Sequence, residues 1–176
     1  MIGEESIQWT VRIALVCYFA GIVQLLVATV SSPVSRMYRW IWTIGCAFFW
    51  LHVAAAFHFV HHWSHAAAFE HIAKQSSEVV GFAFGGGIYF NHAFMVVWLI
   101  DAAWQWISPQ TWRTRPLAIT ALIHGYLAFI VVNATVVFKT GALRWVGLIC
   151  CGIVVALSWK KFKSFAIQIR PDNNPA

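Results

Sequence analysis

The sequence predicts an all-α fold, a polytopic membrane helix bundle with about five transmembrane helices. Of its 176 residues 60% are apolar and only 10% are charged, whereas soluble domains carry about 25% charged residues. Apolar stretches near the roughly 20 residues that span a bilayer recur along the chain, separated by short polar breaks. Many of the 11 tryptophans lie at the ends of these stretches, as is typical of rings placed in the headgroup layer.

Five stretches have the composition of membrane spans. The first ends at Ser31-Ser32-Pro33, because proline disfavours helical geometry in the residue before it. Pro116 suits the first turn of the fourth helix. We expect a single transmembrane domain, residues 1–169, and a disordered tail, residues 170–176. The predicted spans are 7–30, 40–62, 87–107, 116–138 and 142–159.

Basic residues beside the spans predict the orientation, since cytoplasmic loops carry an excess of lysine and arginine. One side has eight of them: Arg36, Arg39, Arg113, Arg115, Lys160, Lys161, Lys163 and Arg170. The other side has four: Arg12, Lys74, Lys139 and Arg144. The N-terminus is therefore expected outside and the C-terminus in the cytoplasm, in a multi-pass protein of the bacterial inner (cytoplasmic) membrane.

The charge of +6 is spread singly or in small groups next to apolar runs. Bases in such positions snorkel toward the interface, so nucleic acid is not an expected partner. The expected partners are the lipid bilayer and further copies of the chain or a larger membrane complex, because five spans make a small unit.

The second connection, about residues 63–86, is the only long one and falls on the predicted outer side. Long loops in compact proteins are often functional. Residues 65–75 are predicted as a short interfacial helix, and the GFAFGGG segment of residues 81–87 is predicted to bend the loop over the histidines.

Six of the eight histidines lie between residues 52 and 71. The side chains of His58, His61, His62 and His65 are predicted to share one face of a helix, an arc of about 100° at about 100° per residue. His92, near the start of the third span, is expected at the same depth as His58. The candidate metal ligands are His58, His61, His62, His65, His71 and His92, with His52 and His124 as secondary candidates.

Clustered imidazoles favour a transition metal, because neutral imidazole is the commonest metal ligand and suits Zn, Fe or Cu. The sequence leaves open whether a reaction is catalysed; if so, Glu70 or Glu78 is the candidate base. Tyr89, Asn91 and Asn133 are candidate hydrogen-bond partners of the ligating rings. The alternative is that these histidines are interfacial and bond to water and loop carbonyls.

Two other functions remain open. In a b-type haem protein that transfers electrons, His58 or His52 with His92 would be the axial ligands. In a transport or sensing module, the histidines would capture metal ions or protons. Outside the cluster, Asp101 is expected to pair with a base such as Arg36 or Arg39 or to be hydrated, with a proton-relay role as the alternative. His124 is expected to be a satisfied core imidazole.

Two stretches carry a resemblance to known families. Residues 58–62 (HFVHH) resemble the H-x-x-H-H box of membrane fatty-acid desaturases and hydroxylases, a di-iron class with several boxes on the cytosolic side. This sequence has one, on the predicted outer side, so that activity is not carried over. Residues 57–91 (FHFVHHWSHAAAFEH…GGGIYFN) resemble a stretch of uncharacterised bacterial His-rich multi-pass membrane proteins, a resemblance that implies no activity.

Overall fold

The computed structural model describes residues 2–28, 35–138 and 141–169, and its regular elements are all helices. The break predicted at residues 31–33 and the tail predicted at 170–176 lie outside this part of the chain. The elements are α1 (Ile2–Val27), α2 (Arg36–Phe59), α3 (His65–Val80), α4 (Gly87–Ile107), α5 (Pro109–Arg113), α6 (Leu117–Val132), the π-helix η1 (Asn133–Val137) and α7 (Ala142–Ile169).

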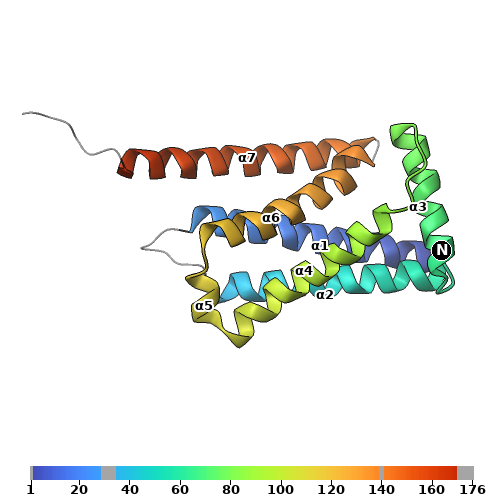
Figure 1. Ribbon diagram of the computed structural model, residues 1–176, viewed down its shortest axis with the longest axis horizontal. Helices are drawn as coiled ribbons and strands as arrows, with labels where there is room; N and C mark the ends of the chain where they lie inside the picture. The colour runs from blue at the N-terminus through green and yellow to red at the C-terminus, as the bar shows by residue number, and fades with distance from the viewer. Residues whose placement is uncertain (1, 29–34, 139–140, 170–176) are drawn as a thin grey trace, which may run out of the picture.

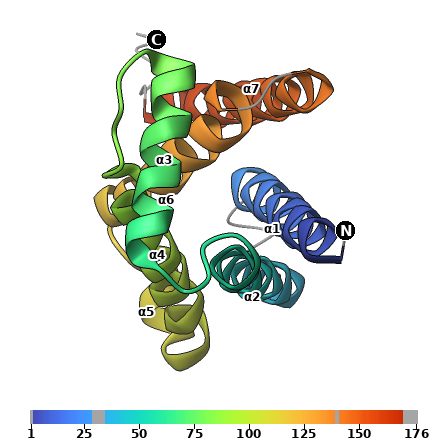
Figure 2. The same ribbon diagram turned by 90° about the vertical axis from the view of Figure 1, so that its right-hand side faces the viewer.

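The long helices run along one axis of the molecule, while α3 lies across one end of them (Figure 1). The end view in Figure 2 shows α3 crossing in front of α4 and α6, with α1 and α2 to one side of it. The opposite end carries the short helix α5. We refer to these as the α3 end and the α5 end.

Among the described residues, three helices are long and apolar enough to cross a membrane: Gly3–Val27, Arg36–Phe59 and Leu117–Val137. The expectation of an all-helical membrane protein is confirmed to this extent. Helix α4 has the predicted bounds, 87–107, but carries Asn91, His92, Asp101 and Gln105, which lower its hydropathy. The predicted third and fifth spans therefore stay predictions.

The prediction of a single helix through His65 is wrong. Helix α2 ends at Phe59, and both His62 and Trp63 have positive φ angles, 48° and 58°. Ser64 then begins α3, because its side chain accepts a hydrogen bond from the Ala67 amide at 3.2 Å, a typical N-cap. The chain turns sharply here, so residues beyond Phe59 do not continue the helical stripe. The short helix expected from residue 65 is confirmed, and it extends to Val80.

Glycines and large aromatic rings form the contact between α1, α2 and α4. A Cβ on Gly45 would lie 2.8 Å from the Cys17 Cβ and 2.9 Å from the Trp98 ring. A Cβ on Gly21 would lie 2.7 Å from the Trp42 ring. Small residues allow helices in membranes to approach closely. The aromatic side chains buried in this core are Tyr18, Tyr38, Trp42, Phe94, Trp98 and Trp112.

A lysine of α7 forms hydrogen bonds to the C-terminal end of α1. The Lys161 Nζ donates hydrogen bonds to the carbonyls of Leu25 and Ala28, at 3.0 and 3.2 Å. The last carbonyls of a helix have no partner inside that helix, and a cation there complements the helix dipole. Lys161, predicted to snorkel, thus caps α1.

The tight α1–α2–α4 contact predicts that Gly45→Ala destabilises the protein by about 1–3 kcal/mol, as for other overpacked cores. Gly125 on α6 is the matched control, because a Cβ there meets nothing within 4 Å. Gly125→Ala should be neutral or stabilising by up to about 1 kcal/mol, through helix propensity. Thermal unfolding in detergent measures both, and equal melting temperatures for the two variants would contradict the described packing.

Candidate functional site

Two pairs of imidazoles meet at the α3 end. The His65 ring, at the start of α3, lies 5.7 Å from the His92 ring on α4, measured between centroids. The His61 ring, in the turn after α2, lies 5.2 Å from the His71 ring on α3. The contact across to His92 was expected from its depth, but the partner comes from α3 and not from α2.

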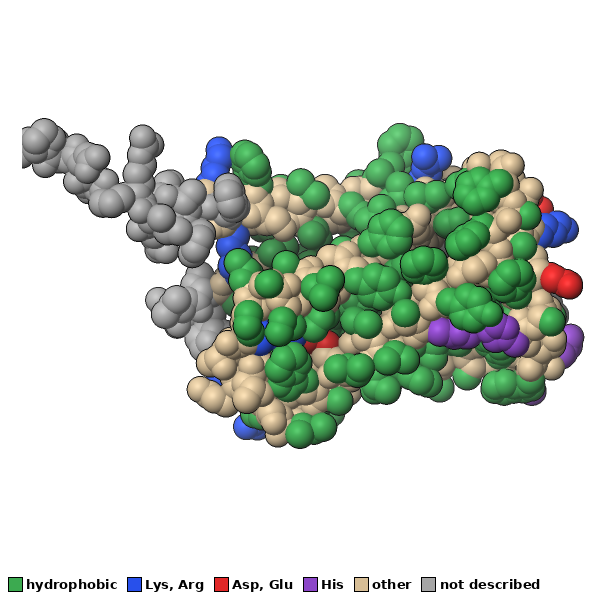
Figure 3. All heavy atoms as spheres, in the orientation of Figure 1, with side chains coloured by type: hydrophobic (Ala, Val, Ile, Leu, Met, Phe, Trp, Pro, Cys, Tyr) green, Lys and Arg blue, Asp and Glu red, His purple; other side chains and the backbone are tan. Residues whose placement is uncertain are grey.

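The Phe57 ring lies between the two pairs. Its centroid is 5.6 Å from that of His61 and 6.1 Å from that of His92. We therefore call His61, His65, His71 and His92 the histidine cluster. In Figure 3 the histidine side chains gather at the same end of the molecule, the α3 end. His61 and His92 are half-buried, whereas His65 and His71 are exposed.

Local packing fixes α3 over α4 and so places the cluster. The Phe69 ring of α3 occupies the space beside Gly85, where a Cβ would come within 2.3 Å of it. The same ring lies 6.5 Å from that of Tyr89 on α4. Gly81 ends α3 in the left-handed conformation, with φ 84°, which glycine adopts without strain. The glycine-rich segment thus folds the chain back from α3 into α4.

Two of the predicted ligands, His58 and His62, have other surroundings. The His58 ring packs 4.6 Å from Phe59 and 6.3 Å from Trp63. His62 is exposed in the turn. The prediction that they share a face with His65 is wrong, because it assumed an unbroken helix.

His52 lies deeper, on α2. Its Nδ1 donates a hydrogen bond to the Ile7 carbonyl of α1, at 3.0 Å, since a carbonyl only accepts. The same side chain lines a cavity of about 150 Å³ that is otherwise mostly apolar. Asn91 of α4 also lines this cavity. These two predicted site residues thus face the interior of the bundle between α1, α2, α4 and α6.

The other predicted polar residues are dispersed. Tyr89 lies beside the cluster, its ring 5.6 Å from that of His65. Asn133 donates to the Phe129 carbonyl of its own helix at 2.7 Å. Glu70 and Glu78, the candidate bases, are exposed on α3.

Within residues 2–28, 35–138 and 141–169, no group of three or more His, Cys, Asp or Glu side chains is arranged to hold a metal ion. The ring spacing within each pair is nevertheless that of two imidazoles bound to one ion. With metal–nitrogen bonds of about 2 Å, two such rings have centroids about 5–6.5 Å apart.

A buried polar network lies toward the α5 end. Asp101 of α4 is fully buried and forms an ion pair with Arg115, whose side chain is also buried. Its carboxylate accepts further hydrogen bonds from the Trp112 Nε1 at 3.0 Å and the Gln105 Nε2 at 3.3 Å. The prediction that Asp101 pairs with a base is confirmed, but the base is Arg115 and not Arg36 or Arg39. The turn through α5 brings Arg115 back to α4, and nothing in the composition of residues 108–116 indicates that reversal.

His124 on α6 extends this network. Its Nε2 lies 3.1 Å from the Arg115 Nη2. A guanidinium only donates, so this nitrogen accepts and the Nδ1 carries the hydrogen of the neutral ring. The buried Nδ1 has no partner among the described residues. The prediction of a satisfied core imidazole is therefore correct for one ring nitrogen only.

Comparisons with known proteins give no match to a family model, to a curated protein or to a solved structure.

The surroundings of His61 predict a pH effect on stability. Burial, and then the nearby His71 and His62, lower the pKa of His61 below its ordinary value of 6.5. The unfolded chain then binds more protons as the pH falls through about 6.5, so acid destabilises the folded state. His61→Gln should weaken this loss, whereas His58→Gln should keep it. Melting temperatures between pH 7.5 and 5.5 measure the effect, and an unchanged acid dependence in His61→Gln would argue against it.

The buried ion pair predicts that Asp101→Asn destabilises the protein by about 3–5 kcal/mol, because the Arg115 charge is left without a counterion. The double variant Asp101→Asn/Arg115→Met should recover much of this loss. Glu78→Gln on exposed α3 is the control and should be near neutral. Unfolding in a denaturing detergent compares them, and a stable single variant would refute the pairing.

Proposed function

We propose that the chain is a five-span inner-membrane protein whose histidine cluster binds a divalent transition-metal ion on the extracytoplasmic side. The spans are α1, α2, α4, α6 with η1, and α7, and α3 lies along the outer interface. The α5 end, with Arg36, Arg39 and Arg113, is cytoplasmic by the positive-inside rule.

The observation that carries this proposal is the 5.2 Å separation of the His61 and His71 rings. The two rings come from separate segments, the turn after α2 and helix α3, so one ion bound by both would join them. A pair supplies two ligands, and the remaining positions of the ion stay open to water or another molecule. Imidazole ligands suit Zn²⁺ and Cu²⁺. An open position is what a metal site needs for catalysis or for transfer of the ion.

The second pair, His65 and His92, supports a site of the same kind, because the two ring centroids are 5.7 Å apart. By contrast, the neighbours of the candidate axial ligands give less support to a haem. His92 faces His65 and Phe57, His58 faces Phe59 and Trp63, and His52 bonds to the α1 backbone. An absorption spectrum without a Soret band would eliminate the haem alternative.

Proton sensing is a second candidate function, favoured by the lowered pKa of His61 next to His71. Two adjacent imidazoles repel when both are protonated. Acidification would then separate the turn after α2 from α3. This function needs no metal, so it predicts a pH response that a chelator leaves unchanged.

The metal proposal predicts that the purified protein binds Zn²⁺ or Cu²⁺ with a stoichiometry of at least one ion per chain. His61→Gln and His71→Gln should each weaken binding at least about tenfold, because changes even outside the ligand set cost 10–100-fold. His58→Gln and His62→Gln are the matched controls and should bind like the unaltered protein. Titration calorimetry at pH 7.5 measures the affinities. Equal losses of metal affinity in all four variants would contradict the proposed pair of ligands.

A further inference from the structure

The α5 end has more positive charge than its acidic residues can balance. The acidic residues of the whole chain are Glu4, Glu5, Glu70, Glu78, Asp101 and Asp172. Of those described, Asp101 alone lies toward the α5 end, and it already pairs with Arg115. Neither Arg39 nor Arg113 has an acidic partner among the residues that the structure describes.

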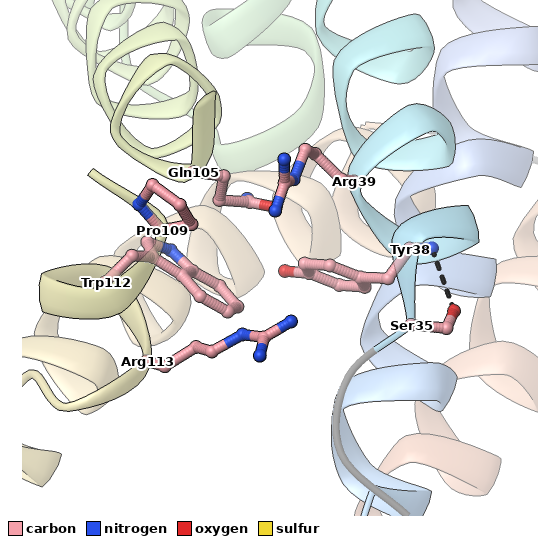
Figure 4. Close-up of a pocket in the computed structure, with 7 residues that line it drawn as sticks. All are labelled: Ser35, Tyr38, Arg39, Gln105, Pro109, Trp112 and Arg113. Carbon is pink, nitrogen blue, oxygen red and sulfur yellow. Dashed lines mark hydrogen bonds between the residues drawn. The ribbon is translucent and has the colours of Figure 1, made fainter. Parts of the chain in front are cut away.

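These two arginines line a small pocket between the start of α2, the end of α4 and α5 (Figure 4). The space in it is about 10 Å³, room for one atom the size of a water or phosphoryl oxygen. The residues that line it are Ser35, Tyr38, Arg39, Gln105, Pro109, Trp112 and Arg113.

The Tyr38 hydroxyl points into this space, with Arg39 on one side of it and Arg113 on the other (Figure 4). Tyr38 is only 1% exposed, and its hydroxyl has no hydrogen-bond partner among the described residues. The ring is fixed between those of Trp42 and Trp112, each 5.7 Å away. A buried hydroxyl without a partner is costly, so this rigidly held donor would be stabilised by an acceptor that enters the pocket.

Two further features favour an anion as that acceptor. The pocket adjoins the N-terminus of α2, where Ser35 caps the helix by accepting from the Tyr38 amide at 3.2 Å. The N-terminus of a helix favours negative charge. The Arg39 guanidinium is also held in place, 4.9 Å over the Trp106 ring. Ordered guanidinium groups bind phosphate oxygens in a bidentate manner.

We propose that this pocket binds a phosphate group, with the Tyr38 hydroxyl and the guanidinium groups of Arg39 and Arg113 as its donors. One phosphoryl oxygen enters the pocket and the others stay at the surface. The group comes either from the headgroup of an anionic phospholipid in the adjacent leaflet or from free phosphate. Basic pockets between membrane helices on the cytoplasmic side bind such headgroups.

The test is thermal unfolding of the full-length protein in a nonionic detergent with a metal chelator, so that the result is independent of the histidine cluster. Phosphatidylglycerol is compared with phosphatidylcholine, and inorganic phosphate with chloride at equal ionic strength. A ligand at a hundred times its dissociation constant should raise the melting temperature by about 5 °C. A rise with phosphatidylglycerol alone assigns a lipid headgroup. A rise with inorganic phosphate as well assigns a site open to free phosphate.

Two variants test the residues. Arg113→Gln should weaken binding about tenfold, the loss of a charge-assisted contact. Tyr38→Phe should also reduce the rise, yet melt no lower than the unaltered protein without ligand, because it removes an unpaired hydroxyl. Arg144→Gln, on exposed α7, is the charge-matched control and should keep the full rise. No rise with either phosphate source, or the same loss in Arg144→Gln, would overturn the site.

Discussion

The Asp101 carboxylate organises the half of the molecule that contains α5. A buried carboxylate is tolerated only when its charge is paired and its oxygens accept hydrogen bonds. Arg115 supplies the charge, and Trp112 and Gln105 supply further donors. Two of these three donors follow α4 in the chain, so the carboxylate holds the α4–α6 connection against the bundle. The position of α6 and of His124 depends on this one group.

The same interaction shapes the proposed phosphate pocket. By accepting from the Trp112 Nε1, Asp101 fixes the indole against which the Tyr38 ring lies, 5.7 Å away. Tyr38 is thereby held with its hydroxyl toward Arg39 and Arg113. Because Asp101 is paired with Arg115, Arg39 and Arg113 have no acidic partner among the described residues and can bind an external anion. Asp101 thus takes part in the buried ion pair and also positions the Tyr38 ring of the proposed phosphate pocket.

The all-helical character was predictable from composition, because apolar runs of about 20 residues match the length of a membrane-spanning helix and a helix satisfies its own backbone in lipid. The bounds of α4 were also correct, since Gly87 and Ser108 mark clear changes of composition. The prediction that four histidines share one helix face was wrong, because the periodicity of a sequence does not show where a helix ends. Ser64 is a good N-cap, and that signal was visible in the sequence.

The candidate sites were predictable only in part, for a physical reason that differs between them. His92 could be placed near other histidines by counting residues along two helices, which fixes depth. The partner of Asp101 could not be predicted in this way, because several arginines lie at the same depth and the direction of the α5 turn decides which of them reaches the carboxylate. The unpartnered Tyr38 hydroxyl is a property of packing on every side, which no local pattern in the sequence encodes.

Metal binding and proton binding are linked in the function proposed for the histidine cluster. An imidazole binds a metal only when neutral, so the two compete for the same nitrogen and metal binding releases protons. The lowered pKa of His61 keeps that ring neutral near pH 7, which favours the metal at neutral pH and release in acid. His61 is half-buried and His71 is exposed. Two such ligands would hold an ion less firmly than a closed four-ligand site. The proposed function is therefore exchange of an ion with the surroundings, not retention of an ion as a permanent part of the fold.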